Sequence, residues 1–93
     1  MKYILVTSDK AMSDIEVGAN YYNGQQKGLG TRFASVIKST LVNIRKMPLA
    51  ASIAFDDTRY KVVEKFPYII LYVVRGNMVF ITRVFNTHQQ PVY

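Results

Sequence analysis

The sequence predicts one α+β domain over residues 1–93, in which a helical hairpin packs on one face of a small, largely antiparallel sheet. Three observations lead to this prediction. A short β-rich run opens the chain, two segments with helical periodicity follow it, and three runs rich in Val, Ile, Tyr and Phe complete it. The predicted order is therefore β-α-α-β-β-β, and 93 residues leave room for one modest core.

The first strand is predicted at residues 2–7 (KYILVT), where a β-rich run ends in polar residues. Ser8 and Asp9 then offer a helix N-cap. Apolar side chains follow at steps of three and four residues: Ala11, Met12, Ile15, Ala19 and Tyr22. We expect one amphipathic helix here, which Gly18 weakens but does not end.

A second helix is predicted between residue 29 and Pro48. The same periodicity returns in an apolar stripe, formed by Leu29, Phe33, Val36, Ile37, Leu41 and Ile44. Four cations lie off this stripe: Arg32, Lys38, Arg45 and Lys46. Pro48 ends the helix, because the residue before a proline is pushed towards an extended conformation.

The segment YYNGQQKGLGTRF, residues 21–33, joins the two helices and raises the question of a phosphate loop. Such a loop needs a strand before it and a helix N-terminus after it, so that the glycine amides point at the anion. Here a helix precedes the glycines, and the Lys-Ser/Thr pair that completes a P-loop is absent. Gly24 and Gly28 are therefore interpreted as the helix-ending and turn glycines of an αα-hairpin.

Three strands are predicted after Pro48, at residues 59–66, 68–74 and 78–86. Proline cannot donate to a sheet ladder, so Pro67 belongs at the start of the second of them. The run at 68–74 (YIILYVV) is apolar on both faces and should be a central strand. The Gly-Asn pair between the last two runs predicts a β-hairpin.

Composition narrows the chemistry that the chain can perform. It has no cysteine, one histidine and six acidic residues, which leaves little material for a metal site, so no metal and no cofactor are expected. The opening apolar run is too short for a signal peptide and no later run suits a membrane span. We therefore expect a cytoplasmic protein with no membrane partner. Its net charge of +6 favours a polyanion or an acidic protein as partner.

The basic residues of the strands predict a binding surface. Side chains alternate between faces along a strand, so Arg59, Lys61 and Lys65 share one face. The helices can cover only one face of the sheet, and we expect these cations and the mid-strand Arg83 on the open face. The tyrosines expected near them are Tyr68, Tyr72 and Tyr93. This mixture suits single-stranded nucleic acid or an acidic peptide, although edge lysines also hinder aggregation, which explains Lys65 better when it is taken alone.

Several motifs follow one another in a recognisable order. They are Ala-x-x-Asp-Ile at 11–15, GLG-x-RF at 28–33, FPY-x-I-x-Y at 66–72 with Arg59 before it, and VFNTHQQP at 84–91. This order resembles the RelE/ParE superfamily of bacterial type II toxins across almost the whole chain. GLG-x-RF and FPY-x-I-x-Y look closer to the ParE branch.

The resemblance implies a small cytoplasmic toxin that is neutralised by an antitoxin encoded beside it. ParE-like members inhibit DNA gyrase, whereas RelE-like members cut mRNA in the ribosomal A site, so gyrase or the ribosome is the implied target. The gyrase inhibitor is favoured, because Asn86, His88 and Gln89 stand where many relatives end in H-x-R-R-x-P. Ile69 likewise stands where such ribonucleases often carry a basic residue. A non-toxic binding module that kept the fold is a third alternative.

Site residues follow from the charge pattern together with this resemblance. The residues expected to bind the target or the antitoxin are Arg59, Lys61, Lys65, Tyr72, Arg83 and Tyr93. If the chain were a metal-independent endoribonuclease, its catalytic groups would be Arg59, Lys61, Arg83 and His88. A lone histidine in a polar tail is more typical of a solvated side chain than of a catalytic one.

Overall fold

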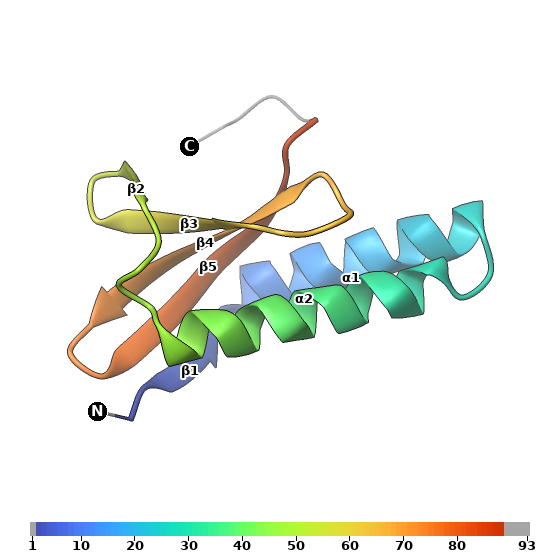
Figure 1. Ribbon diagram of the computed structural model, residues 1–93. Helices are drawn as coiled ribbons and strands as arrows, with labels where there is room; N and C mark the ends of the chain where they lie inside the picture. The colour runs from blue at the N-terminus through green and yellow to red at the C-terminus, as the bar shows by residue number, and fades with distance from the viewer. Residues whose placement is uncertain (1, 89–93) are drawn as a thin grey trace.

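The computed structural model describes residues 2–88 and has the predicted architecture (Figure 1). Two helices form a hairpin that packs against one face of a five-stranded sheet. The elements in chain order are β1 (Ile4–Thr7), α1 (Asp9–Gln25), α2 (Leu29–Lys46), β2 (Ile53–Phe55), β3 (Thr58–Val62), β4 (Tyr68–Arg75) and β5 (Met78–Asn86). The α+β class and the helical hairpin are confirmed, and β2 is an additional strand.

The strands lie in the order β1-β5-β4-β3-β2. Only β1 and β5 are parallel, and every other neighbouring pair is antiparallel. The prediction of a central strand at 68–74 is confirmed, because β4 lies between β3 and β5. The short β2 was not predicted because its sequence, IAF, is too brief to show alternation.

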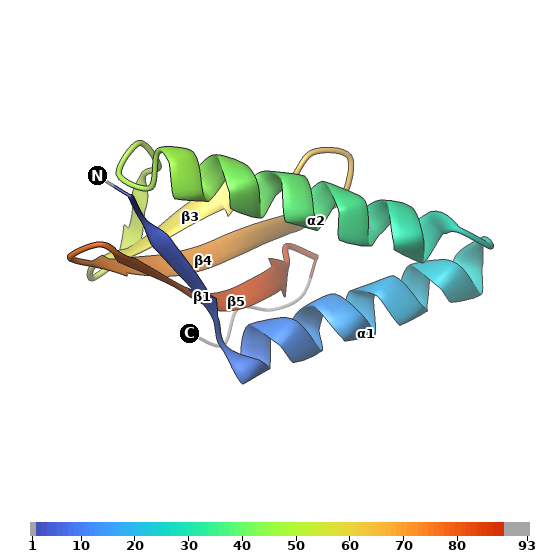
Figure 2. The same cartoon turned by 90° about the horizontal axis from the view of Figure 1, so that it is seen from below.

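The core lies between the hairpin and the sheet. Its largest fully buried side chains are Tyr72, Phe33, Ile37, Ile44, Ile70, Ile81 and Val79. In Figure 2, α1 runs beside β5, while α2 runs along the side of β4 and β3. Within residues 2–88, neither helix is long and apolar enough to cross a membrane.

The two helices approach closely at two glycines. A Cβ atom on Gly30 would lie 2.0 Å from the carbonyl oxygen of Ala19, and one on Gly18 would lie 2.8 Å from the ring of Phe33. Gly18 lies inside α1, as predicted, and a larger residue there would press on the buried ring of Phe33.

The glycines of the turn between the helices serve the backbone rather than an anion. Gly28 has a φ of 86° and adopts the left-handed conformation before α2, as its interpretation as a turn glycine requires. The amide of Gly30, in the first turn of α2, donates to Oδ1 of Asn23 at 2.8 Å. A donor at this helix N-terminus is thus already satisfied from α1.

Candidate protein-binding groove

The pairing of β3 with β4 decides which way the basic residues point. Arg59 is paired with Tyr72 and Lys61 with Ile70, and both partners belong to the core beneath the helices. Residues paired across a sheet share a face, so Arg59 and Lys61 lie on the helix side. The expectation that they lie on the open face is wrong. Arg59 is half-buried and Lys61 is exposed, so the hairpin covers this side of β3 only in part.

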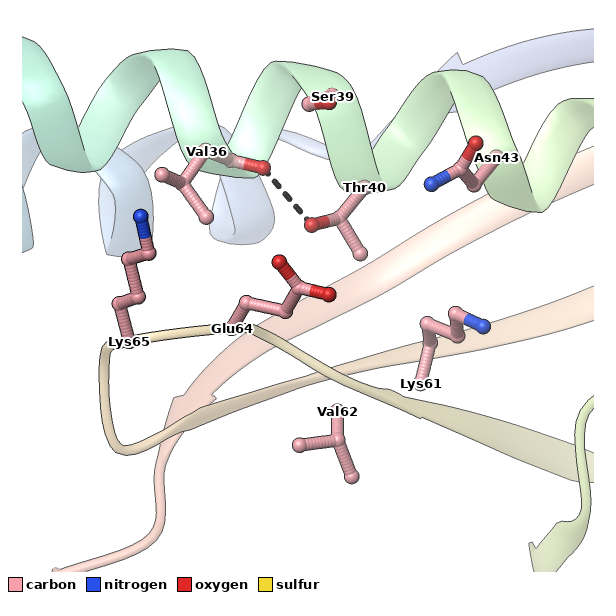
Figure 3. A pocket seen from close by; sticks show the side chains of 8 residues that line it. All are labelled: Val36, Ser39, Thr40, Asn43, Lys61, Val62, Glu64 and Lys65. Atoms are coloured by element: carbon pink, nitrogen blue, oxygen red, sulfur yellow. Dashed lines mark hydrogen bonds between the residues drawn. The ribbon is translucent and has the colours of Figure 1, made fainter.

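The opposite face of β3 is apolar. Tyr60 is 36% exposed and Val62 is 62% exposed, and both alternate away from Arg59 and Lys61. Figure 3 shows the side chain of Val62 pointing away from α2. The helix-free face therefore carries apolar side chains where we expected cations.

Arg59 and Tyr72 hold the loop that follows α2. Nη1 of Arg59 donates to the carbonyl oxygens of Ala51 at 2.6 Å and Leu49 at 3.3 Å, and the hydroxyl of Tyr72 donates to the carbonyl oxygen of Pro48 at 2.6 Å. Tyr72 is 0% exposed, and burial raises the pKa of its hydroxyl, an effect that Arg59 partly offsets. Its expected place on an open surface is wrong, and Tyr68, at 7% exposure, is buried as well.

Arg83 lies at the other side of the sheet, along the edge of β5 that β1 leaves uncovered. Its Nε donates to Oδ2 of Asp14 at 2.7 Å and its Nη2 donates to Oδ1 at 3.3 Å. The amide of Val84 donates to the same Oδ2 at 3.0 Å. The mid-strand charge thus has a partner on α1 at the edge of the sheet, and its expected position beside Arg59 is wrong.

A bulge explains this position of Arg83. Leu71 is paired with Arg83 and Tyr72 with Ile81, so Thr82 is an extra residue in β5. The hydroxyl of Thr82 donates to the carbonyl oxygen of Leu71 at 3.1 Å. Such bulges bend a strand and change the direction of its side chains, which periodicity in the sequence does not reveal.

A groove runs between α2 and β3. Its middle part has a volume of about 250 Å³ and is lined by Val36, Ser39, Thr40, Asn43, Lys61, Val62, Glu64 and Lys65 (Figure 3). A second cavity of about 280 Å³ shares Asn43 and Lys61 with it and continues past the end of α2. A third, of about 370 Å³, shares Lys65 and continues towards the start of α2. We call these three adjacent cavities the α2–β3 groove.

The α2–β3 groove is positively charged. Its cations are Arg32 and Lys46 from α2 and Lys61 and Lys65 from the opposite wall, while Glu64 is its acidic residue. The ion pairs found within residues 2–88 join Arg75 to Asp57 and Arg83 to Asp14, so none of them neutralises these four cations. The groove can therefore attract an anionic segment of a partner.

The sequence predicted two of the four cations of this groove. Lys61 and Lys65 were expected at a binding surface, whereas Arg32, Asn43 and Lys46 were not. The sequence feature that could have predicted the α2 side of the groove is the spacing of residues 32, 36, 39, 43 and 46. They follow one another at steps of three and four residues and so form a second stripe on α2. Because that stripe is mostly polar, it is typical of a solvated face until β3 is placed against it.

The remaining predicted residues lie elsewhere. His88 is exposed just after β5, where its amide donates to Oδ1 of Asn86 at 2.8 Å. Tyr93 and Gln89 fall outside the described residues. Among residues 2–88, no three histidine or acidic side chains come close enough together to hold a metal ion.

Comparison with known proteins connects this fold to a solved structure. The sequence matches no protein-family model and no curated protein sequence. Its structure is similar to a chain from the chromosomal ParDE TA system of P. aeruginosa, with a TM-score of 0.83 and 16% sequence identity over 91% of this chain and 96% of that chain. The chain therefore has the predicted α+β fold, and it shares this fold with a chain of a ParDE system.

Proposed function

We propose that this chain is the toxin of a type II toxin–antitoxin system, that it acts by binding and inhibiting DNA gyrase, and that a cognate antitoxin neutralises it. Support comes from the order of its motifs and from its structural similarity to a chain of a ParDE system. The observation that carries the choice of a binding toxin over a ribonuclease is the separation of Arg59 from Arg83.

The cations that RNA cleavage would need do not converge. Adjacent strands are about 4.8 Å apart, and β4 lies between β3 and β5, so the backbones of Arg59 and Arg83 are about 10 Å apart. Arg59 pairs with Tyr72, whereas Arg83 pairs with Leu71, which alternates to the other face of β4. A transition-state phosphate requires several preorganised donors aimed at one position, and these two point to different places.

Both arginines also have structural partners already. Arg59 donates to two carbonyl oxygens of the loop after α2, and Arg83 donates to Asp14. A catalytic guanidinium would have to break these contacts to reach a substrate. Binding through the α2–β3 groove needs no such rearrangement, because its cations form no ion pair within residues 2–88.

The α2–β3 groove is the surface best suited to an acidic antitoxin. It presents four cations over apolar and polar side chains of α2, and the whole chain carries a net charge of +6. Opposite charges accelerate association, while the apolar contacts supply most of the affinity. The side chains that line the groove thus suit a partner segment in which carboxylates alternate with apolar side chains.

A growth assay and a supercoiling assay test the proposed activity. Expression without an antitoxin should stop growth and induce the DNA-damage response, and the purified chain should inhibit supercoiling of relaxed plasmid by gyrase at micromolar concentration. Normal supercoiling at that concentration would exclude gyrase as the target. Primer extension on mRNA from the same cells separates the alternative: discrete A-site ends that vanish in Arg83→Ala would establish a ribonuclease instead.

A further inference from the structure

The cavity at the start of α2 combines an apolar floor with two cations. Its volume is about 370 Å³, and it is lined by Tyr22, Leu29, Arg32, Lys65, Phe66 and Pro67. We call it the anchor pocket. It brings together the end of α1 and the first turn of α2 with the segment between β3 and β4, which is distant from both in sequence (Figure 1).

The floor of the anchor pocket is held by an aromatic cluster. The rings of Tyr22 and Phe66 are 4.9 Å apart, those of Phe33 and Phe66 are 5.2 Å apart, and those of Phe33 and Tyr68 are 4.8 Å apart. Tyr22 and Phe66 are only half-buried, so this fixed cluster presents apolar surface to the pocket. A preformed apolar surface binds a side chain with little loss of its own conformational entropy.

The rim of the anchor pocket is cationic. Arg32 on α2 and Lys65 on the opposite wall are both exposed, and neither takes part in an ion pair within residues 2–88. None of the described residues that line the pocket carries a carboxylate. A ligand that matches it has an apolar body for the floor and a negative charge for the rim.

The backbone of Lys65 adopts an uncommon conformation. Its φ is 68°, in the left-handed region that glycine and asparagine adopt most easily. A lysine there is more strained than glycine would be. Strain of this kind is often found at binding sites, where the side chain is needed for another purpose.

The size and position of the pocket identify the class of ligand. A volume of about 370 Å³ is at the lower end of the range of about 300–1,000 Å³ for small-molecule sites, so it suits one or two side chains. Lys65 also lines the middle of the α2–β3 groove, so a bound chain can continue along α2 towards Lys61 (Figure 3). This row of adjacent cavities favours a peptide segment over a free small molecule.

We propose that the anchor pocket binds a large apolar side chain, flanked by carboxylates, from an acidic segment of a protein partner. This inference deepens the proposed function and rests on it only for the existence of a protein partner. The apolar side chain contacts Tyr22 and Phe66, and the flanking carboxylates meet Arg32 and Lys65. The anchor pocket then fixes the position of the segment along the α2–β3 groove, since it alone among the three cavities of that groove is lined by two aromatic rings.

Synthetic peptides test the pocket without knowledge of the natural partner. The probes are the peptides EEGFEEG and EEGSEEG, acetylated at the N-terminus and amidated at the C-terminus, titrated into the full chain labelled with ¹⁵N. We expect the phenylalanine peptide to shift the amide signals of Leu29, Arg32, Lys65 and Phe66, and to bind more tightly than the serine peptide. Equal binding of both peptides, or shifts confined to other surfaces, would overturn the proposal.

A pair of double variants with the same loss of charge completes the test. Arg32→Gln with Lys65→Asn should raise the Kd of the phenylalanine peptide by about two- to thirtyfold, since each exposed ion pair contributes about 0.2–1 kcal/mol. Lys38→Gln with Arg45→Gln removes two cations that line none of the three cavities and should leave Kd unchanged. Equal weakening by both variants would mean nonspecific attraction and would overturn the proposal.

Two further measurements keep the outcomes distinct. Lys65→Asn alone should leave the Tm unchanged or raise it, because asparagine tolerates the left-handed backbone, so weaker binding would not reflect unfolding. The gyrase assay is independent of the peptide titration. A chain that binds the phenylalanine peptide in the anchor pocket but leaves supercoiling normal would contradict the gyrase function alone, and the reverse result would contradict the anchor pocket alone.

Discussion

Asp14 on α1 and Arg83 on β5 are joined by two hydrogen bonds, of 2.7 Å to Oδ2 and 3.3 Å to Oδ1 of the carboxylate. The same carboxylate accepts the amide of Val84 at 3.0 Å. Asp14 thus accepts a hydrogen bond from a backbone amide on the part of the β5 edge that β1 does not cover. It also connects the first helix to the last strand. An unpaired donor at a sheet edge would otherwise be open to pairing with another chain.

Removing the carboxylate should therefore destabilise the fold more than removing the arginine. Hydrogen bonds to charged groups contribute about 1.5–3 kcal/mol, so Asp14→Ala should lower the free energy of unfolding by about that amount. Arg83→Gln should cost less than about 1 kcal/mol, because the side chain of Arg83 is 36% exposed and that of Asp14 only 14%. Urea denaturation of both variants measures the difference, and equal losses would contradict this view of Asp14.

Two glycine substitutions should change stability in opposite directions. A Cβ on Gly30 would lie 2.0 Å from the carbonyl oxygen of Ala19, so Gly30→Ala must push the helices apart and should cost about 1–3 kcal/mol. Gly24 lies in α1, and a Cβ added to it would meet nothing within 4 Å, so Gly24→Ala should add about 0.5–1 kcal/mol. Thermal unfolding followed by circular dichroism tests both, and a stabilised Gly30→Ala would contradict the close packing of the hairpin.

Replacing Arg59 should loosen the loop after α2. Arg59→Gln removes the donors to the carbonyl oxygens of Leu49 and Ala51 while the sheet ladder of β3 stays intact. We expect amide hydrogen exchange to become about five- to tenfold faster at Ala50 and Tyr60, whose amides donate to Met47 and Ser52. Unchanged exchange at these amides would show that the hydroxyl of Tyr72 on Pro48 suffices to hold the loop.

Three tyrosines should make stability fall at alkaline pH. Burial raises the pKa of Tyr22, Tyr68 and Tyr72 above the ordinary value of 10.0, so the folded chain keeps their protons longer than the unfolded chain does. Their contribution to stability is fully present below pH 10 and is lost as the pH rises from there through the folded pKa values. Tyr72→Phe should make this decline shallower by up to about 1.4 kcal/mol per pH unit, and parallel curves between pH 9 and 11.5 would contradict the prediction.

Local features of the sequence determined the elements of this fold. The apolar stripes of residues 11–22 and 29–44 predicted both helices, and Gly28 predicted the turn between them. The apolar run at 68–74 predicted the central strand β4. These features depend on side-chain period and backbone conformation within a few residues, so they can be derived from the sequence alone.

Only the tertiary structure decided which face the basic residues occupy. Alternation along β3 shows that Arg59 and Lys61 share a face, but it does not distinguish the covered face from the open one. That choice depends on the pairing of β3 with β4 and on where α2 lies, and both involve residues distant in sequence. The same reason explains why two other features could not be predicted: the contact of Asp14 with Arg83, 69 residues apart, and the bulge at Thr82. Both depend on the register between strands distant in sequence, which local periodicity does not determine.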